Sequence, residues 1–159
     1  MKRILFQLCI LALIGTFITS CATKSRTIRH AEVSFIKDKQ LRKVVDEWIG
    51  VPYRYGGNSK SGIDCSGLVK VILAKAYGLE PNIRTAEGYC KASNSIKKSK
   101  LKEGDLVFFS IPKPTDFHVG IYLGKEKFVH ATTSKGVRID DLHFPYYKES
   151  FYGGGRIKY

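Results

Sequence analysis

The chain has 159 residues, of which 43% are hydrophobic and 12% are aromatic, and its formal net charge is +13. This length suits one domain, and the composition excludes an intrinsically disordered or collagen-like chain. The excess of positive charge predicts an anionic partner, although a basic surface that serves only solubility fits it equally well.

The first 20 residues have the pattern of an export signal. Lys2 and Arg3 precede an apolar run over residues 4–18, which is short for a membrane span. The Ile-Thr-Ser-Cys that ends at Cys21 resembles a bacterial lipobox, in which the cysteine becomes the lipidated first residue of the mature protein. We therefore expect a signal peptide over residues 1–20 and a lipidated tether over residues 21–37. A transmembrane anchor is the alternative.

Export narrows the choice of partners for the positive charge. Removal of residues 1–20 takes away Lys2 and Arg3 and leaves a net charge of +11. Nucleic acid is not expected in this compartment, whereas anionic cell-wall polymer and lipid head groups are. We expect a monomer that is anchored by its lipid in the bacterial cell envelope. The outer membrane, on its periplasmic side, is the expected location, although the sequence does not specify which membrane or which face.

The folded domain is expected to cover residues 38–159 and to begin with helices. Apolar residues at helical spacing predict a helix over residues 38–50, with Asp38 as its N-cap. A second helix is expected from residue 64 or 65 to residue 78, with Asp64 as the capping residue. A weaker helical pattern begins at residue 85 and runs through residue 90.

Strand-forming residues dominate the second half of the domain. Short connections between these runs favour antiparallel pairing, so we expect one sheet of about five to six strands. Helices followed by strands predict an α+β fold, with N-terminal helices packed on a C-terminal antiparallel sheet. The expected strands are residues 106–110, 118–123, 127–132, 136–139 and 155–159.

Cys65 begins the second predicted helix, directly after a loop rich in Gly and Ser over residues 53–63. The partial positive charge of a helix N-terminus favours a thiolate, and small neighbouring residues leave the sulfur accessible. Cys90 is the other cysteine of the predicted domain. The two could form a disulfide in an oxidising compartment, or one could be a reactive thiol and the other a small buried residue.

A nucleophilic cysteine needs a base, which is usually a histidine. In a hairpin that turns about Gly124, His118 and His130 would stand directly opposite each other and point to the same face. Such a pair suits a base and the group that orients it, but two unrelated strand histidines fit the spacing equally well. Zinc bound by Cys65 and both histidines is a further alternative. No close ligand pair such as Cys-x-x-Cys is present, so no metal or other cofactor is expected.

Four segments in this order resemble the NlpC-type family of bacterial cell-wall cysteine peptidases, which have a papain-like fold. They contain the sequences YRYGGNSKSGIDCSG, GDLVFF, HVGIYLG and FVHA, and the resemblance covers roughly residues 39–157. It implies that Cys65 is the nucleophile, that His118 is the general base, and that His130 is the third polar residue, which orients His118. The implied reaction passes through a thioacyl intermediate on Cys65.

The resemblance also implies roles for three residues near the nucleophile. The hydroxyl of Tyr55 would assist at the reacting carbonyl, and Asp64 and Ser66 would line the peptide site. Packing and helix capping are the alternatives for these three residues. A disulfide to Cys90 would block the nucleophile Cys65, so we expect Cys90 to be free.

The activity implied is that of an endopeptidase that cleaves peptidoglycan stem peptides or their cross-links beside diaminopimelate. The sequence does not say whether the γ-D-glutamyl bond or the D-alanyl cross-link is cut. An amidase or an acyltransferase on the same fold is one alternative. A lipoprotein that only binds peptidoglycan is another, and the complete set of one cysteine and two histidines argues against it.

Overall fold

A computed structural model of the chain describes residues 31–111 and 117–157. The chain divides into two units, residues 1–34 and 35–159, and the second contains the helices and strands described below. The expected signal peptide and the lipidation site Cys21 lie outside the described residues, so both stay predictions. Within the described ranges, no helix has the length and apolar character that crossing a membrane requires.

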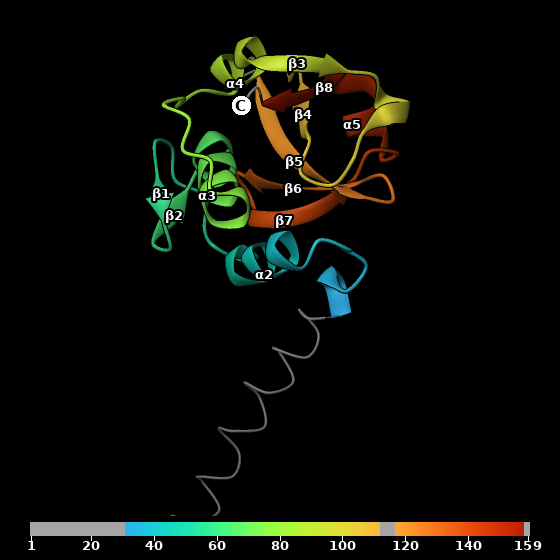
Figure 1. Cartoon of the computed structure of the whole chain (residues 1–159). Helices are drawn as coiled ribbons and strands as arrows, with labels where there is room; N and C mark the ends of the chain where they lie inside the picture. The colour runs from blue at the N-terminus through green and yellow to red at the C-terminus, as the bar shows by residue number, and fades with distance from the viewer. Residues whose placement is uncertain (1–30, 112–116, 158–159) are drawn as a thin grey trace, which may run out of the picture. The chain divides into compact units, whose positions relative to one another are not determined.

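Six antiparallel strands form the main sheet, in the order β3-β8-β4-β5-β6-β7 (Figure 1). The five predicted strands are confirmed, with β8 beginning four residues earlier than expected, and β3 was not predicted. The strands are β3 (Ser93–Ile96), β4 (Leu106–Phe109), β5 (His118–Gly124), β6 (Lys127–Thr132), β7 (Gly136–Asp141) and β8 (Phe151–Ile157).

Most of the helices precede the sheet in the chain, and one short helix lies between β7 and β8. This arrangement confirms the α+β fold. The bounds are α2 (Lys39–Trp48), α3 (Cys65–Tyr77), α4 (Ala86–Ala92) and α5 (Pro145–Ser150), with a short 3₁₀ turn over Lys98–Lys100. Asp38 caps α2 as predicted, because its carboxylate accepts the backbone N–H groups of Gln40 and Leu41. Helix α3 ends at Gly78, whose φ of 67° is left-handed.

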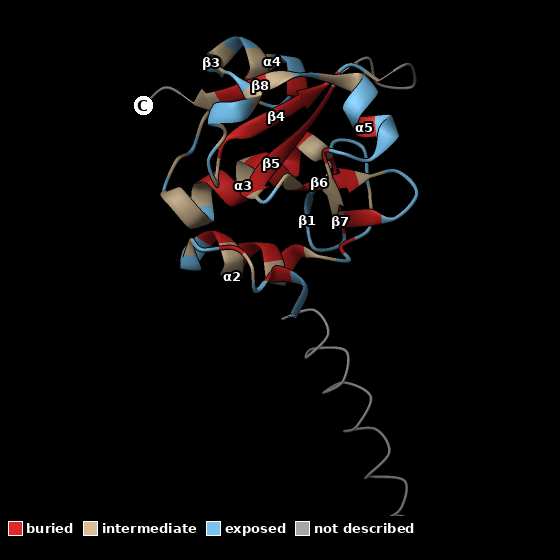
Figure 2. Cartoon of the chain, turned by 90° about the vertical axis from the view of Figure 1, so that its right-hand side faces the viewer, coloured by how far each residue is buried: buried red, intermediate tan, exposed pale blue. Residues whose placement is uncertain are grey.

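Helix α3 packs against β5 and β6, and α2 packs against α3 (Figure 1). Every residue of β4 is buried, as are the first six residues of β5, so both faces of these central strands are covered (Figure 2). This explains why these segments read as continuous apolar runs instead of alternating ones. Helix α3 is therefore fixed against the strand that begins at His118.

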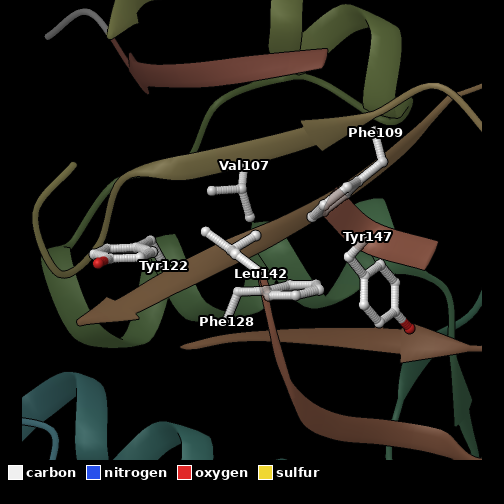
Figure 3. Packing of buried hydrophobic residues seen from close by; sticks show 6 residues of the cluster. All are labelled: Val107, Phe109, Tyr122, Phe128, Leu142 and Tyr147. Atoms are coloured by element: carbon white, nitrogen blue, oxygen red, sulfur yellow. The ribbon is translucent and has the colours of Figure 1, made fainter. Parts of the chain in front are cut away.

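One face of the central strands carries a cluster of large apolar and aromatic side chains (Figure 3). Tyr147, from α5, lies against Phe109 and Phe128, with ring centroids 5.5 and 5.0 Å apart. Because Tyr147 joins the cluster, the short helix α5 is held beside the sheet. The cluster consists of Val107, Phe109, Tyr122, Phe128, Leu142 and Tyr147.

A two-residue turn joins β5 to β6, and its geometry corrects the predicted register. Lys125 and Glu126 have φ values of 51° and 59°, which are typical of a tight hairpin turn of type I′. The pairing shifts at a bulge between Tyr122 and Gly124. The register beyond the bulge pairs Ile121 with Val129, so it places Gly120, and not His118, opposite His130.

The prediction of directly opposite histidines is therefore wrong by two residues. The prediction that both side chains point to the same face of the sheet still holds, because residues two positions apart along a strand have side chains on the same face. His118 and His130 are diagonal neighbours. A Cβ placed on Gly120 would lie 2.8 Å from Cδ2 of Phe128 and from the carbonyl oxygen of Val129, and 3.3 Å from the Cβ of His130, so strand β6 leaves no space for a side chain at residue 120.

The loop before α3 forms a small hairpin of β1 (Asn58–Ser59) and β2 (Gly62–Ile63). It packs tightly on the start of α3, because a Cβ placed on Gly67 would lie 2.3 Å from the carbonyl oxygen of Gly57. The Asp64 N–H also donates to that oxygen, at 3.3 Å. The loop and the first turn of α3 are thus fitted to one another without space for a side chain at residue 67.

Candidate active site

His118 and His130 are joined by a hydrogen bond inside the domain. Nε2 of His118 lies 2.8 Å from Nδ1 of His130, and the two side chains are almost fully buried. The rings of Phe109 and Phe128 lie against them, with centroid distances of 6.2 Å to His118 and 4.6 Å to His130. The prediction that these two histidines act as a pair is supported by this contact.

A carboxylate continues the hydrogen-bonded chain beyond His130. Oδ2 of Asp140 lies 2.8 Å from Nε2 of His130, on the neighbouring strand β7. The hydroxyl of Tyr147 donates to the same oxygen at 3.0 Å, and Nη2 of Arg138 donates to Oδ1 at 2.6 Å. We call the chain Asp140–His130–His118 the relay.

Cys65 lies where two pockets meet. The first, of about 380 Å³, is lined by Cys65 together with His118 and His130, and we call it the histidine pocket. The second, of about 760 Å³, is lined by Cys65 together with Asp64 and Arg84, and we call it the loop pocket. A chain that ran through both pockets would therefore pass over the sulfur, and the predicted nucleophile shares a pocket with both predicted partners.

Burial raises the pKa of the Cys65 thiol to about 11, although backbone N–H groups oppose it. The opposing groups are the amide of Val119 on β5 and the amides of Ser66 and Cys65 itself in the first turn of α3. The expected influence of the helix start is thus present, but burial outweighs it when no substrate is bound. These amides are suitably placed to stabilise negative charge near the sulfur.

Burial also keeps both imidazoles neutral. It lowers the pKa of His118 to about 3, and the neighbouring His130 lowers it further in the same direction. Burial lowers the pKa of His130 as well, although the contact with Asp140 works against this. Neutral imidazole is the form that can accept a proton from a thiol.

Asp64 and Ser66 have clear structural roles on either side of the nucleophile. Oδ1 of Asp64 accepts the Gly67 N–H at 2.6 Å, and Oδ2 accepts the Gly56 N–H at 2.7 Å, so the side chain caps α3 and fastens the loop. The Ser66 hydroxyl lies 2.9 Å from Asp64 Oδ1 and 2.8 Å from the carbonyl oxygen of Arg84. Both residues line the loop pocket, and their contact with substrate stays a prediction.

Two tyrosines of the loop differ in their relation to the sulfur. Tyr55 is 83% exposed and lines the loop pocket. Tyr53, which the sequence analysis did not single out, lines both pockets, and its pKa is raised by burial and then by Cys65. An isolated bridge joins the backbone of Tyr53 to that of Ile63, which lies two residues before Cys65.

Cys65 and Cys90 are both free thiols. Cys90 lines a different pocket, of about 230 Å³, with Phe108 and Tyr152. No group of His, Cys, Asp and Glu side chains in the described part of the chain is arranged to hold a metal ion, which leaves the zinc alternative without support there.

Residues 50–156 match the NlpC/P60 family. The chain belongs to the NlpC/P60 family. The fold is similar to the crystal structure of a Staphylococcus aureus protein of the same family, which is described as similar to lipoprotein. The TM-score is 0.68 and the sequence identity is 30%, over 76% of this chain and 41% of that one. The NlpC/p60 domain of the peptidoglycan hydrolase SagA gives a TM-score of 0.63 at 26% identity, over 77% of this chain and 100% of that domain. The papain-like α+β fold expected from the sequence is confirmed.

Relatives of this NlpC/P60 chain have names that describe cell-wall hydrolysis. A Haemophilus influenzae protein named probable endopeptidase NlpC homolog is 40% identical over 134 residues, which cover 84% of this chain and 69% of that protein. Murein DD-endopeptidase MepS/Murein LD-carboxypeptidase of Escherichia coli is 43% identical over 122 residues, which cover 77% of this chain and 63% of that protein. The NlpC-type peptidoglycan peptidase expected from the motifs is thus confirmed at the level of the family.

Besides Tyr53, three further polar residues of the site were not predicted from the sequence: Asp140, Arg138 and Tyr147. Asp140 lies ten residues after His130, and the antiparallel pairing of β6 with β7 brings the two together. A signal was available in the sequence, because two acidic residues, Asp140 and Asp141, directly follow the predicted strand over residues 136–139, which comes after the strand of His130. Recognising it required the register of β7, which the sequence alone does not give.

Proposed function

We propose that this chain is a cysteine endopeptidase that cleaves the D-alanyl cross-link between peptidoglycan stem peptides, next to diaminopimelate. The observation that carries the proposal is the position of Cys65 between two pockets, with the two hydrogen-bonded histidines in one of them. Pockets on both sides of a nucleophile suit a peptide that continues beyond the cleaved bond in both directions. The 43% identity to a protein named murein DD-endopeptidase supports this bond over the γ-D-glutamyl bond.

The reaction begins with transfer of the Cys65 thiol proton to His118. The sulfur then attacks the carbonyl carbon of the peptide bond, and the amides at the start of α3 hold the oxygen that becomes negative. His118 returns the proton to the leaving amine, which departs as the first product. Water, whose proton His118 accepts, hydrolyses the thioester and restores the thiol.

Digestion of a purified cross-linked muropeptide dimer, followed by mass spectrometry, tests this reaction. Cleavage at the cross-link yields two monomers, and each mass identifies the broken bond. The variants Cys65→Ala and His118→Ala should reduce turnover to the background, because they remove the nucleophile and the base. Release of fragments cut after the γ-glutamyl residue would replace the proposed bond with the other one, and full activity of Cys65→Ala would overturn the mechanism.

We also propose that Cys21 carries lipid and anchors a monomeric enzyme in the outer membrane, facing the periplasm. The support is the basic start, the apolar run and the small residues that precede Cys21. Several acyl chains on one residue give stable anchoring, since each buried methylene contributes roughly 0.8 kcal/mol. Radiolabelled palmitate should enter the wild-type chain but not Cys21→Ala, and fractionation should recover the label with the outer membrane. Unlabelled wild-type protein would refute the anchor without affecting the proposed reaction.

A further inference from the structure

The relay ends on a carboxylate that is tied to the protein at both of its oxygens. Asp140 is 14% exposed, and Oδ2 contacts His130 and Tyr147, while Oδ1 contacts Arg138. Burial acts to raise the pKa of Asp140, but the contacts with His130, Tyr147 and Arg138 outweigh it, and the pKa is lowered. Asp140 is therefore an ionised carboxylate, which accepts hydrogen bonds and donates none.

An acceptor at one end determines the position of every proton in the relay. Because Asp140 can only accept, Nε2 of His130 carries a hydrogen, and in a neutral ring Nδ1 of His130 is then an acceptor. That acceptor faces Nε2 of His118, which must therefore carry a hydrogen. Nδ1 of His118 is left as the ring nitrogen with a free electron pair.

We propose that Asp140 is a positioning residue that selects the tautomers of both histidines and so leaves Nδ1 of His118 able to take the proton of Cys65. The inference rests on the cysteine-peptidase reaction proposed above. With the opposite tautomers, Nδ1 of His118 would already carry a hydrogen and would have no free electron pair with which to accept the thiol proton. When the thiol proton arrives at Nδ1, the new charge is stabilised through the hydrogen bond to His130, whose own N–H points at the carboxylate.

The substitution Asp140→Asn tests this directly, because the amide keeps the shape and can reverse the relay. Arg138 donates at Oδ1, so it holds the amide oxygen on that side and turns the NH₂ group toward His130. His130 must then accept at Nε2 and carry its hydrogen on Nδ1, and His118 is forced into the unproductive tautomer. In a serine-protease triad the equivalent change lowers kcat about 10⁴-fold. With a second imidazole in between, we expect a fall in kcat of about 100-fold or more and an unchanged KM.

Asp141→Asn is the matched control, because it makes the same chemical change one residue away. Asp141 is half-exposed and contacts Lys127 and the backbone of His143 instead of the relay. It should keep wild-type kcat. The double variant Arg138→Ala/Asp140→Asn is a second test, since loss of the guanidinium lets the amide turn its oxygen back to His130. The kcat of this double variant should be at least tenfold higher than that of Asp140→Asn.

Nitrogen NMR of the ¹⁵N-labelled full-length protein in detergent reads the tautomers without any substrate. Wild type should show a hydrogen on Nε2 of each ring, and Asp140→Asn should show it on Nδ1 of each ring. Wild-type tautomers in an Asp140→Asn protein that has lost activity would overturn the proposal and leave a merely structural role. The proposal would also fail if Asp140→Asn kept wild-type kcat. If wild type failed to cut the muropeptide, the proposed function would fall, while a reversal seen by NMR would still establish the control of tautomers.

Discussion

Replacing Gly67 by Ala tests how closely the loop must approach the helix that carries the nucleophile. In a helix, this change normally stabilises a protein by about 1 kcal/mol, because glycine has a low helix propensity. Here the added Cβ would lie 2.3 Å from the carbonyl oxygen of Gly57 and 3.1 Å from Oδ1 of Asp64. Since the first contact is with backbone, relief requires the loop to move away from α3. Overpacking of this kind costs about 1–3 kcal/mol.

A moved loop also strains the cap of α3. The Gly67 N–H donates to Asp64 at 2.6 Å, and the loss of such a cap costs about 1 kcal/mol. The two costs outweigh the gain in helix propensity, so we expect a net destabilisation of about 1–3 kcal/mol. For a domain of this size, that corresponds to a fall in Tm of roughly 4–10 °C. Turnover should fall as well, because the loop supplies one wall of the pocket beside Cys65.

Thermal unfolding followed by circular dichroism measures the effect, with Gly153→Ala as the control. A Cβ on Gly153 has no neighbour within 4 Å, so this variant makes the same chemical change without a clash. It should leave Tm within about 2 °C of wild type. An unchanged or higher Tm in Gly67→Ala would refute the reasoning, since it would mean that helix propensity dominates and that the close approach imposes no constraint.

Three further predictions concern the chemistry of the site. Tyr53→Phe should lower kcat by about 10²-fold or more, as expected for loss of a donor near the oxyanion, whereas Tyr55→Phe should not, and the reverse order in muropeptide turnover would reassign the assisting hydroxyl. Stability should fall as the pH drops below 6.5, because the unfolded chain then protonates His118 whereas the native state does not until about pH 3. The variant His118→Gln should therefore show a smaller loss between pH 7 and pH 5 in urea unfolding, and an equal loss would contradict the low pKa. The rate of alkylation of Cys65 by iodoacetamide should keep rising above pH 8, because burial raises the pKa of the thiol to about 11; a plateau below pH 8 would show a resting thiolate.

The elements that could be predicted from the sequence are those determined by local chemistry. Asp64 is an N-cap by residue type and position, and α3 begins directly after it. Strand β3, in contrast, has one apolar residue in four and is an edge strand, so its pairing with β8 leaves little trace in its own sequence. Helix α5, which begins with Pro145, has six residues and is too short to show a periodic pattern of apolar residues.

The site was predicted only as far as the motifs reach. Cys65, His118 and His130 could be recognised because each lies in a distinctive local sequence. The relative position of the two histidines depends on a bulge that shifts the hairpin register, and this bulge could not be predicted from the local sequence. Asp140 depends on a further pairing, that of β6 with β7, so its contact with His130 could not be read from either segment alone.

The bulge near Leu123 has a consequence for how the gene of such a protein can change. Side chains alternate along strands, so insertion or deletion of one residue in the paired part of the hairpin would turn one histidine to the opposite face of the sheet. The distance in sequence between His118 and His130 is therefore constrained in parity as well as in length. Insertion or deletion of a single codon in the paired part of the hairpin should therefore abolish catalysis. The two-residue turn at Lys125 and Glu126, in contrast, can tolerate substitution as long as its backbone conformation is kept.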